Sequence, residues 1–162
     1  MKKIVIVDYG LGNIRSVEQS LKKIIDEDKQ SGQVYITNNA KDLCFATHVI
    51  LPGQGAFASC MLGLKNIPGM IDELSENILI KKKPFLGICV GMQLLANVGY
   101  ENGNHNGLGW IGGEIKKMPQ KNLKLPHMGW NEAVIKKDND LIKEEKNQNY
   151  YFVHSYYFNC KS

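Results

Sequence analysis

Residues 84–95 read PFLGICVGMQLL, and this stretch decides the fold that the sequence predicts. Pro84 precedes a short apolar run typical of a buried strand, and residues from about 90 to 97 favour a helix. Between the two stands GICVG (residues 87–91), a cysteine with glycine at both second neighbours. A sharp turn from strand to helix crowds the adjoining side chains, so it needs glycine there and lifts the middle residue outward. We therefore expect Cys89 at the tip of a strand–turn–helix elbow.

The elbow also predicts the chemistry of Cys89. The N-terminus of the following helix favours the thiolate, which is the nucleophilic form of cysteine. The backbone N–H of Val90 would point to where an oxyanion forms after attack on a carbonyl. The alternative is a buried structural cysteine between two unrelated glycines, and the strand and helix predicted on either side argue against it.

Two neighbouring features fit the same site. LPGQG (residues 51–55) ends the adjacent predicted strand, and glycine there lets a backbone amide approach a substrate oxygen closely. Gly53 is therefore a candidate second oxyanion donor, although Pro-Gly is also a common strand terminator. Gln93 follows Cys89 by one helical turn, so both side chains are expected to face one pocket. The alternative for Gln93 is a surface position on the helix.

The order of predicted elements indicates an α/β domain. Short apolar runs predict strands, and apolar residues at helical spacing predict helices. In chain order these are strand 3–8, helix 14–26, strands 34–37 and 48–51, helices across 55–82 with a break at 68–69, strand 85–88 and helix 90–97. This alternation predicts a mostly parallel, doubly wound sheet with helices on both faces.

The later part of the chain differs in character. Residues 109–118, 131–136 and 150–160 have strand-like patterns without long helices between them, so we expect mixed or antiparallel strands there. No internal repeat or low-complexity linker divides the sequence, and 162 residues is an ordinary length for one domain. We therefore predict a single domain over residues 1–162.

Charge and composition argue against several function classes. The net charge is +4, but Arg15 is the sole arginine and the lysines are scattered, unlike a nucleic-acid-binding face. No apolar run is long enough for a membrane span or a signal peptide, which predicts a cytosolic protein. The four cysteines have no C-x-x-C spacing, so neither a zinc site nor a redox pair is expected.

A glycine-rich turn after the first strand, GLGNIR at residues 10–15, invites comparison with a dinucleotide-binding site. The third glycine of that pattern would fall at Arg15, and no lysine of a phosphate-binding loop is present. We expect no nucleotide cofactor and no metal.

Beyond the elbow, five further stretches stand in order along the chain. They are DYGLGN at 8–13, LPGQGAF at 51–57, GLGW at 107–110, PHMGWN at 126–131 and YFVHSYY at 151–157. Together with the elbow they resemble the class I glutamine amidotransferases, whose fold is flavodoxin-like. Within that family they are most similar to the glutaminase subunits of imidazole glycerol phosphate synthase.

The resemblance implies a reaction and a set of site residues. Cys89 would attack the side-chain amide of glutamine, release ammonia and form a glutamyl thioester, which water hydrolyses to glutamate. The oxyanion would be bound by Gly53 and Val90. The glutamine would be held by Gln93, Ser155 and Tyr156.

The resemblance also implies a partner, a (β/α)₈-barrel cyclase that forms a heterodimer with the glutaminase. The ammonia would pass to that subunit, which makes imidazole glycerol phosphate and the purine precursor AICAR in histidine biosynthesis. The residues expected to face the partner are Asn13, His127, Met128, Trp130 and Asn131. The resemblance implies neither a cofactor nor a metal.

The sequence departs from this family at the general base. The family has a His-Pro-Glu segment beyond the His-Ser-Tyr strand, and these 162 residues contain no His-x-Glu at all. We therefore expect that a C-terminal segment is missing and that this chain is inactive or very weak, because nucleophile and base act as a unit. His154 is the histidine that stands nearest to the expected site. A smaller departure is Gln54, where the family usually has an apolar residue.

Two other functions remain open from the sequence. One is a paralogous ammonia-supplying subunit of a sugar amidotransferase. The other is a catalytically inert module that binds the barrel partner, which the absent base favours and the intact elbow opposes.

Overall fold

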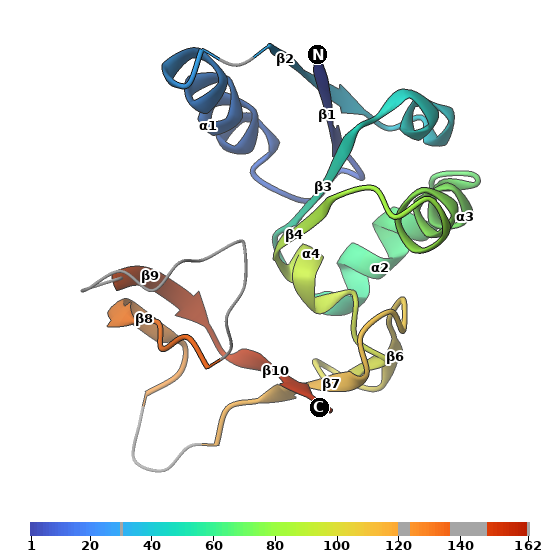
Figure 1. Ribbon diagram of the computed structural model, residues 1–162. Helices are drawn as coiled ribbons and strands as arrows, with labels where there is room; N and C mark the ends of the chain where they lie inside the picture. Colours follow the sequence, from blue (N-terminus) through green and yellow to red (C-terminus); the bar gives the residue numbers. More distant parts are fainter. Residues whose placement is uncertain (30, 120–123, 137–148, 162) are drawn as a thin grey trace.

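In the computed structural model, which describes residues 1–29, 31–119, 124–136 and 149–161, the N-terminal half builds a parallel sheet (Figure 1). Its strands lie in the order β2-β1-β3-β4. They are β1 (Lys2–Val7), β2 (Gly32–Thr37), β3 (His48–Gly53) and β4 (Phe85–Cys89). All pairings are parallel, with Ile50 opposite both Ile6 and Leu86. The predicted parallel sheet is confirmed.

One face of this sheet is covered by α1 (Ile14–Glu27) (Figure 1). The helix packs the apolar stripe that its 3.6-residue period creates. The stripe consists of Ile14, Val17, Leu21 and Ile25, packed against Ile4, Ile6 and Ile50.

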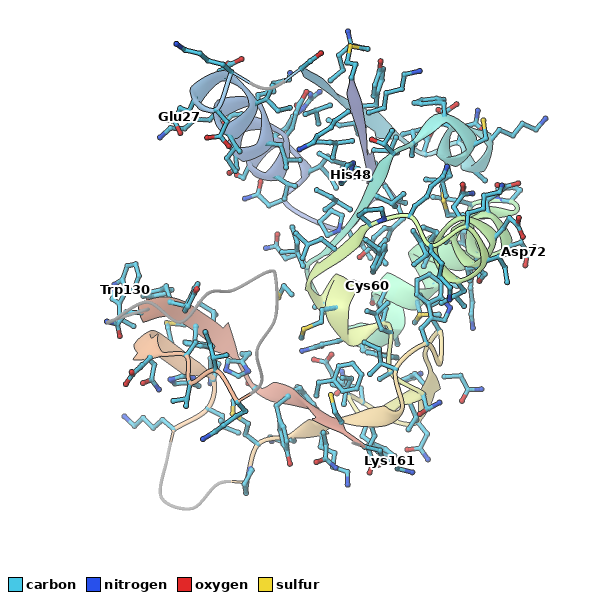
Figure 2. The ribbon with its side chains drawn as sticks, in the orientation of Figure 1. Glu27, His48, Cys60, Asp72, Trp130 and Lys161 are labelled. Atoms are coloured by element: carbon cyan, nitrogen blue, oxygen red, sulfur yellow. The ribbon has the colours of Figure 1, made fainter. Side chains whose placement is uncertain are left out.

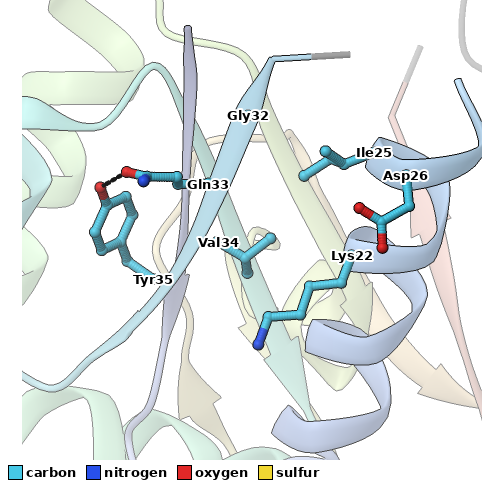
Figure 3. A pocket seen from close by; sticks show the side chains of 7 residues that line it. All are labelled: Lys22, Ile25, Asp26, Gly32, Gln33, Val34 and Tyr35. Atoms are coloured by element: carbon cyan, nitrogen blue, oxygen red, sulfur yellow. Dashed lines mark hydrogen bonds between the residues drawn. The ribbon is translucent and has the colours of Figure 1, made fainter. Parts of the chain in front are cut away.

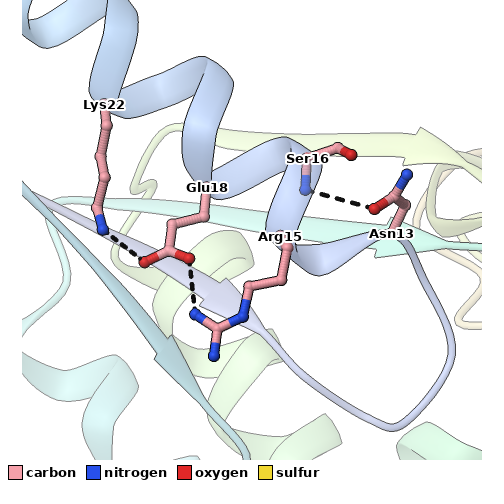
Figure 4. Close-up of polar contacts among 5 residues, drawn as sticks. All are labelled: Asn13, Arg15, Ser16, Glu18 and Lys22. Atoms are coloured by element: carbon pink, nitrogen blue, oxygen red, sulfur yellow. Dashed lines mark hydrogen bonds and ion pairs between the residues drawn. The ribbon is translucent and has the colours of Figure 1, made fainter.

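Polar contacts fix the start and the outer side of α1 (Figure 4). The Asn13 side chain caps the helix by accepting a bond from Ser16 N at 3.4 Å. The Glu18 carboxylate then binds Arg15 and Lys22, both at 2.8 Å. The i+3 and i+4 spacings place these groups on neighbouring turns, which is why the pairs form.

The other face is covered by a short 3₁₀ helix and by the helices after β3. They are η1 (Ala40–Phe45), α2 (Phe57–Lys65), α3 (Met70–Ser75) and the π-helical η2 (Glu76–Ile80). The predicted break lies at Gly69, which adopts a left-handed φ of 72°. This larger core includes Val5, Val7, Val49, Leu51, Phe57, Cys60 and Leu64, all essentially inaccessible to solvent.

The helix predicted for residues 90–97 is shorter in the structure. It is α4 (Val90–Gln93). The following residues turn away because their carbonyls are taken by a distant loop: Leu108 N donates to Leu94 O at 2.7 Å, and Gly109 N donates to Ala96 O at 3.0 Å. The helical prediction was therefore wrong beyond residue 93.

The C-terminal strands form a mixed sheet and a separate ribbon. The sheet runs β10-β7-β5-β6, with β5 (Val98–Gly99), β6 (His105–Asn106), β7 (Gly113–Lys117) and β10 (Tyr156–Cys160). Only β5–β7 is parallel among these pairs. The ribbon pairs β8 (His127–Glu132) with β9 (Asn149–His154), antiparallel. The mixed and antiparallel extension is confirmed.

The three strands predicted for the later part of the chain differ most from the structure, whereas the four earlier strands differ by one or two residues at their ends. The strand expected at 109–118 is limited to β7, and the strand expected at 131–136 lies four residues earlier as β8. The segment 150–160 is broken at Ser155, where the chain leaves the ribbon and enters the mixed sheet. In the described parts of the chain, no helix has both the length and the apolar character needed to cross a membrane.

Candidate functional site

Cys89 stands at the junction of β4 and α4, as the elbow predicts. It is the last residue of β4. Its backbone adopts φ 53° and ψ −119°, a conformation that residues with a side chain rarely adopt. The two glycines are required by close packing. A Cβ at Gly87 would lie 2.7 Å from the Met92 Cα, and a Cβ at Gly91 would overlap the Leu51 carbonyl oxygen. The turn therefore tolerates no side chain two positions before or two positions after the nucleophile.

A cavity of about 260 Å³ opens beside the Cys89 thiol, which is exposed to solvent. It is lined by Gln54, Gly55, Cys89, Val90, Gln93, Glu101, Pro126, Val153, His154, Ser155 and Tyr156. Five of the predicted site residues meet here, from segments more than 60 positions apart. They are Cys89, Val90, Gln93, Ser155 and Tyr156.

Gly53 is placed slightly differently from the expectation. It ends β3 directly opposite Cys89 in the β3–β4 pairing, but it does not line the cavity. Its successors Gln54 and Gly55 do. A Cβ at Gly53 would lie 2.5 Å from the Gly91 backbone nitrogen, so glycine is needed there for packing against the elbow. The loop that follows β3, rather than Gly53 alone, faces the nucleophile.

Glu101 is a lining residue that the sequence reasoning missed. Its Oε2 accepts a hydrogen bond from Phe57 N at 2.8 Å, at the start of α2. Among the lining residues that the structure describes, it is also the sole carboxylate. No local sequence pattern identifies it, because its hydrogen-bond partner Phe57 lies 44 positions earlier in the chain.

Of the four histidines, His154 alone lines the cavity. Its Nδ1 lies 2.9 Å from Tyr156 O, which can only accept, so Nδ1 carries the hydrogen. Its Nε2 lies 3.2 Å from His127 Nδ1 across the ribbon. His48 contacts Thr47 at a strand start, and His105 contacts the Asn102 carbonyl. One hydrogen bond therefore joins the two imidazole rings, and only one of these two nitrogens needs to carry a hydrogen.

The expected partner-facing residues fall into two groups. Asn13 caps α1 and lines a separate hollow of about 420 Å³ at the start of that helix. His127, Met128, Trp130 and Asn131 all lie on β8. Met128 and Trp130 stand two positions apart on β8, so their side chains point to one side of the ribbon, and they are 61% and 73% exposed. Figure 2 labels Trp130. Val153 and Tyr151 oppose them on β9 and extend the same apolar side.

The larger hollow of about 450 Å³ lies elsewhere, between α1 and β2 (Figure 3). It is lined by Lys22, Ile25, Asp26, Gly32, Gln33, Val34 and Tyr35. Its described lining residues include no cysteine, serine or threonine, and it lies at β2, the edge strand opposite the β4 edge that carries the elbow. Across the residues that the structure describes, no group of three His, Cys, Asp or Glu side chains is arranged to hold a metal ion.

Comparison with known proteins identifies the family of this chain. Residues 5–162 match the family model described as glutamine amidotransferase class-I. A protein of Rhodospirillum rubrum called imidazole glycerol phosphate synthase subunit HisH is 42% identical over 160 residues, covering 96% of this chain and 75% of that protein. Campylobacter jejuni subunit HisH 1 is 45% identical over 161 residues, covering 98% and 76%. The chain thus spans about three quarters of these relatives.

A solved structure described as a crystal structure of glutamine amidotransferase aligns with a TM-score of 0.53. The aligned part covers 70% of this chain and 56% of that chain, at 16% identity. At that identity the match bears on the fold alone, and it agrees with the α/β architecture described above.

Proposed function

This chain belongs to the class I glutamine amidotransferases, in the family of HisH subunits of imidazole glycerol phosphate synthase, and on that premise we propose that Cys89 is its glutamine-attacking nucleophile. The observation that carries the proposal is the position of Cys89, at a strained elbow that opens into a cavity with Gln93, Ser155 and Tyr156. A conformation of this kind costs on the order of 1–3 kcal/mol and persists where function requires it.

The first half of the reaction forms a thioester. The Cys89 sulfur attacks the side-chain carbonyl carbon of glutamine, and the carbonyl oxygen becomes an oxyanion. The backbone N–H of Val90 and an amide of the loop at Gly53 stabilise that charge, because donors fixed in advance do not reorganise during reaction. The carbon–nitrogen bond then breaks, and ammonia leaves with one added proton.

The second half regenerates the thiol. Water attacks the thioester carbonyl, the carbon–sulfur bond breaks, and glutamate leaves while the sulfur recovers its proton. These proton transfers need a base, and the 162 residues contain no His-x-Glu. We therefore infer that the turnover of these 162 residues by themselves is absent or very weak.

The cavity also has groups suited to the rest of a glutamine molecule. Glu101 is the lining carboxylate, and it would pair with the α-ammonium group. The amide of Gln93 and the groups of Ser155 and Tyr156 would bind the α-carboxylate and the side-chain amide.

We propose that the exposed side of the β8–β9 ribbon contacts a (β/α)₈-barrel cyclase, which receives the ammonia in the cytoplasm. The support is the apolar surface of Met128, Trp130, Tyr151 and Val153, which the described parts of the chain leave exposed. Aromatic residues and methionine are enriched at protein interfaces. Relatives called HisH favour this histidine-pathway partner over a sugar amidotransferase.

The test is site-specific labelling with a diazoketone analogue of glutamine, read by intact mass and peptide mapping. Cys44 and Cys160 are also exposed thiols and serve as internal controls. The expected result is one adduct at Cys89, prevented by excess glutamine and absent in Cys89→Ser. Equal labelling of the three exposed thiols would contradict the proposal, because it would reflect accessibility alone. No labelling, even with the cyclase present, would favour the inert binding module.

A further inference from the structure

The loop that joins β3 to α2 carries Gln54 and Gly55 into the cavity wall, and side chains hold it at three points. The Tyr9 hydroxyl donates to the Pro52 carbonyl oxygen at 2.7 Å. The Cys60 thiol donates to the Gln54 carbonyl oxygen, with a sulfur–oxygen distance of 3.5 Å. Where the loop enters α2, Phe57 N donates to Glu101. The peptide between Gly53 and Gln54 lies between the first two held carbonyls.

Tyr9 occupies a slot that two glycines create. A Cβ at Gly53 would lie 2.7 Å from the Tyr9 hydroxyl oxygen. A Cβ at Gly63, on α2, would lie 2.8 Å from the Tyr9 carbonyl oxygen and 3.0 Å from its ring. Tyr9 itself is 6% exposed. The ring is therefore fixed between the end of β3 and α2, with its hydroxyl directed at the loop.

Both donors keep their hydrogen at neutral pH. Burial raises the pKa of the Tyr9 phenol, and the neighbouring Cys60 raises it further. Burial also raises the pKa of the Cys60 thiol, and this effect outweighs the opposing influence of the neighbouring Tyr9 hydroxyl and Gln54 carbonyl. Each carbonyl therefore faces a group that donates, and the loop has no alternative protonation state to accommodate near neutral pH.

We propose that Tyr9 is a positioning residue of the glutaminase site: its hydroxyl fixes the loop of residues 52–55 so that a backbone amide faces the oxyanion formed at Cys89. This inference rests on the proposed function. Tyr9 does not line the cavity, so it acts through the Pro52 carbonyl and not on the substrate. Oxyanion donors are effective only within a narrow distance of the charge, and a loosened loop would lose that alignment. Cys60 is the second anchor of the same loop.

The test compares two reactions of Cys89 that differ in one requirement. An activated γ-glutamyl aryl ester acylates the sulfur: a carbon–sulfur bond forms, the carbon–oxygen bond to the aryl group breaks, and aryloxide leaves without needing a proton. This step passes through an oxyanion. Iodoacetamide alkylates the same sulfur by displacing iodide and forms no oxyanion. Aryloxide release in a single turnover measures the first reaction, and peptide mapping of the Cys89 adduct measures the second.

In Tyr9→Phe we expect the acylation rate to fall about tenfold, less than the roughly 10²–10³-fold loss of a direct oxyanion donor. The alkylation rate at Cys89 should stay within about twofold, since it needs no oxyanion stabilisation. The matched control is Tyr35→Phe, which removes a phenol hydroxyl bonded to Gln33 at the far edge of the sheet (Figure 3). It should change neither rate.

Cys60 provides a second pair of variants, which decides the matter if Tyr9→Phe does not fold. Cys60→Ala removes the donor and should slow acylation selectively, whereas Cys60→Ser keeps a donor and should restore it. Equal rates in Tyr9→Phe and the unaltered chain would overturn the inference, as would an equal fall in both reactions. Absence of aryloxide release from the unaltered chain would instead overturn the proposed function, so the two failures are distinguishable.

Discussion

The Cα of Gly91 faces the Leu51 carbonyl oxygen so closely that any side chain at position 91 would overlap that oxygen. Leu51 is fully buried in the middle of the parallel sheet, and the atom in question belongs to its backbone. Neither partner can yield by a rotamer change. The start of α4 therefore rests directly on β3, which is what keeps Cys89 beside the loop after Gly53.

Gly91→Ala should consequently damage both stability and reactivity. Overpacking of a tight contact costs about 1–3 kcal/mol, and here backbone must move because no side chain is available to give way. Chemical denaturation would measure the loss, and γ-glutamyl ester acylation of Cys89 should fall with it. Gly112→Ala is the control, since a Cβ there meets its nearest neighbour at 3.9 Å. Equal stability of the two variants would contradict the close contact.

The strained backbone at Cys89 predicts that a substitution which relieves the strain raises stability while it removes acylation. A positive φ disfavours any residue with a side chain, so Cys89→Gly should be about 1 kcal/mol more stable than Cys89→Ala. Both variants lose acylation. At Cys160, the last residue of strand β10, the order should reverse, because glycine in extended backbone is less stable than alanine by up to about 0.5–1 kcal/mol. The same order at both positions would mean that the elbow is unstrained.

Glu101→Gln should weaken the binding of glutamine analogues without unfolding the site. The amide oxygen can still accept from Phe57 N, but the negative charge opposite the α-ammonium group is lost. A hydrogen bond to a charged group contributes about 1.5–3 kcal/mol, so the diazoketone concentration for half-maximal labelling should rise about tenfold or more. Glu114→Gln, on β7 outside the cavity, should leave this concentration unchanged.

Much of this site follows from the sequence because its geometry is local. The glycines around Cys89 describe one turn, and the elbow and its neighbouring loop lie at the ends of adjacent parallel strands. Glu101 and Tyr9 could not be found in the same way. Their hydrogen bonds to Phe57 and Pro52 join residues 44 and 43 positions apart, and no periodicity encodes them.

The fold was predictable to a similar limit. The stripe from Ile14 to Ile25 identifies α1, since its pattern reflects burial on one face. The segment after Gln93 has the composition of a helix, yet its carbonyls bond to residues 107–111 and the helix ends. Tertiary hydrogen bonds overrode local propensity there, as propensity is a weak effect for each residue.

Trp130→Ala should separate docking from folding. With 73% of its surface exposed, the side chain contributes little to the free energy of unfolding, which should change by less than about 0.5 kcal/mol. Loss of a central aromatic contact would weaken binding to the cyclase by about 2 kcal/mol, or roughly thirtyfold in Kd. Titration calorimetry measures the second quantity. Ile80→Ala, 70% exposed on η2, should leave binding unchanged.

The ion pairs of α1 predict that the thermal stability of the fold depends slightly on pH in the acid range. The hydrogen bonds from Lys22 and Arg15 lower the pKa of the Glu18 carboxyl below its ordinary 4.5. A lowered pKa stabilises the fold above the unfolded value, and this contribution disappears as the pH falls through the folded value. The Tm difference between the unaltered chain and Glu18→Gln should therefore be largest near neutral pH. It should shrink as the pH falls below 4.5. A constant difference would contradict this. Glu27→Gln, whose partner Lys23 is 3.6 Å away, should give a smaller difference.

A single residue, Ser155, separates β9 of the ribbon from β10 of the mixed sheet. The ribbon end carries the exposed Tyr151 and Val153, and Val153 lines the cavity together with Ser155 and Tyr156. Ser155 therefore belongs both to the connection between the ribbon and the mixed sheet and to the wall of the cavity. The backbone hydrogen bonds between β8 and β9 and the covalent chain of β9 connect Trp130 to Ser155. Any change in how the ribbon sits relative to the mixed sheet would therefore turn the backbone at Ser155, in the wall of the cavity beside Cys89.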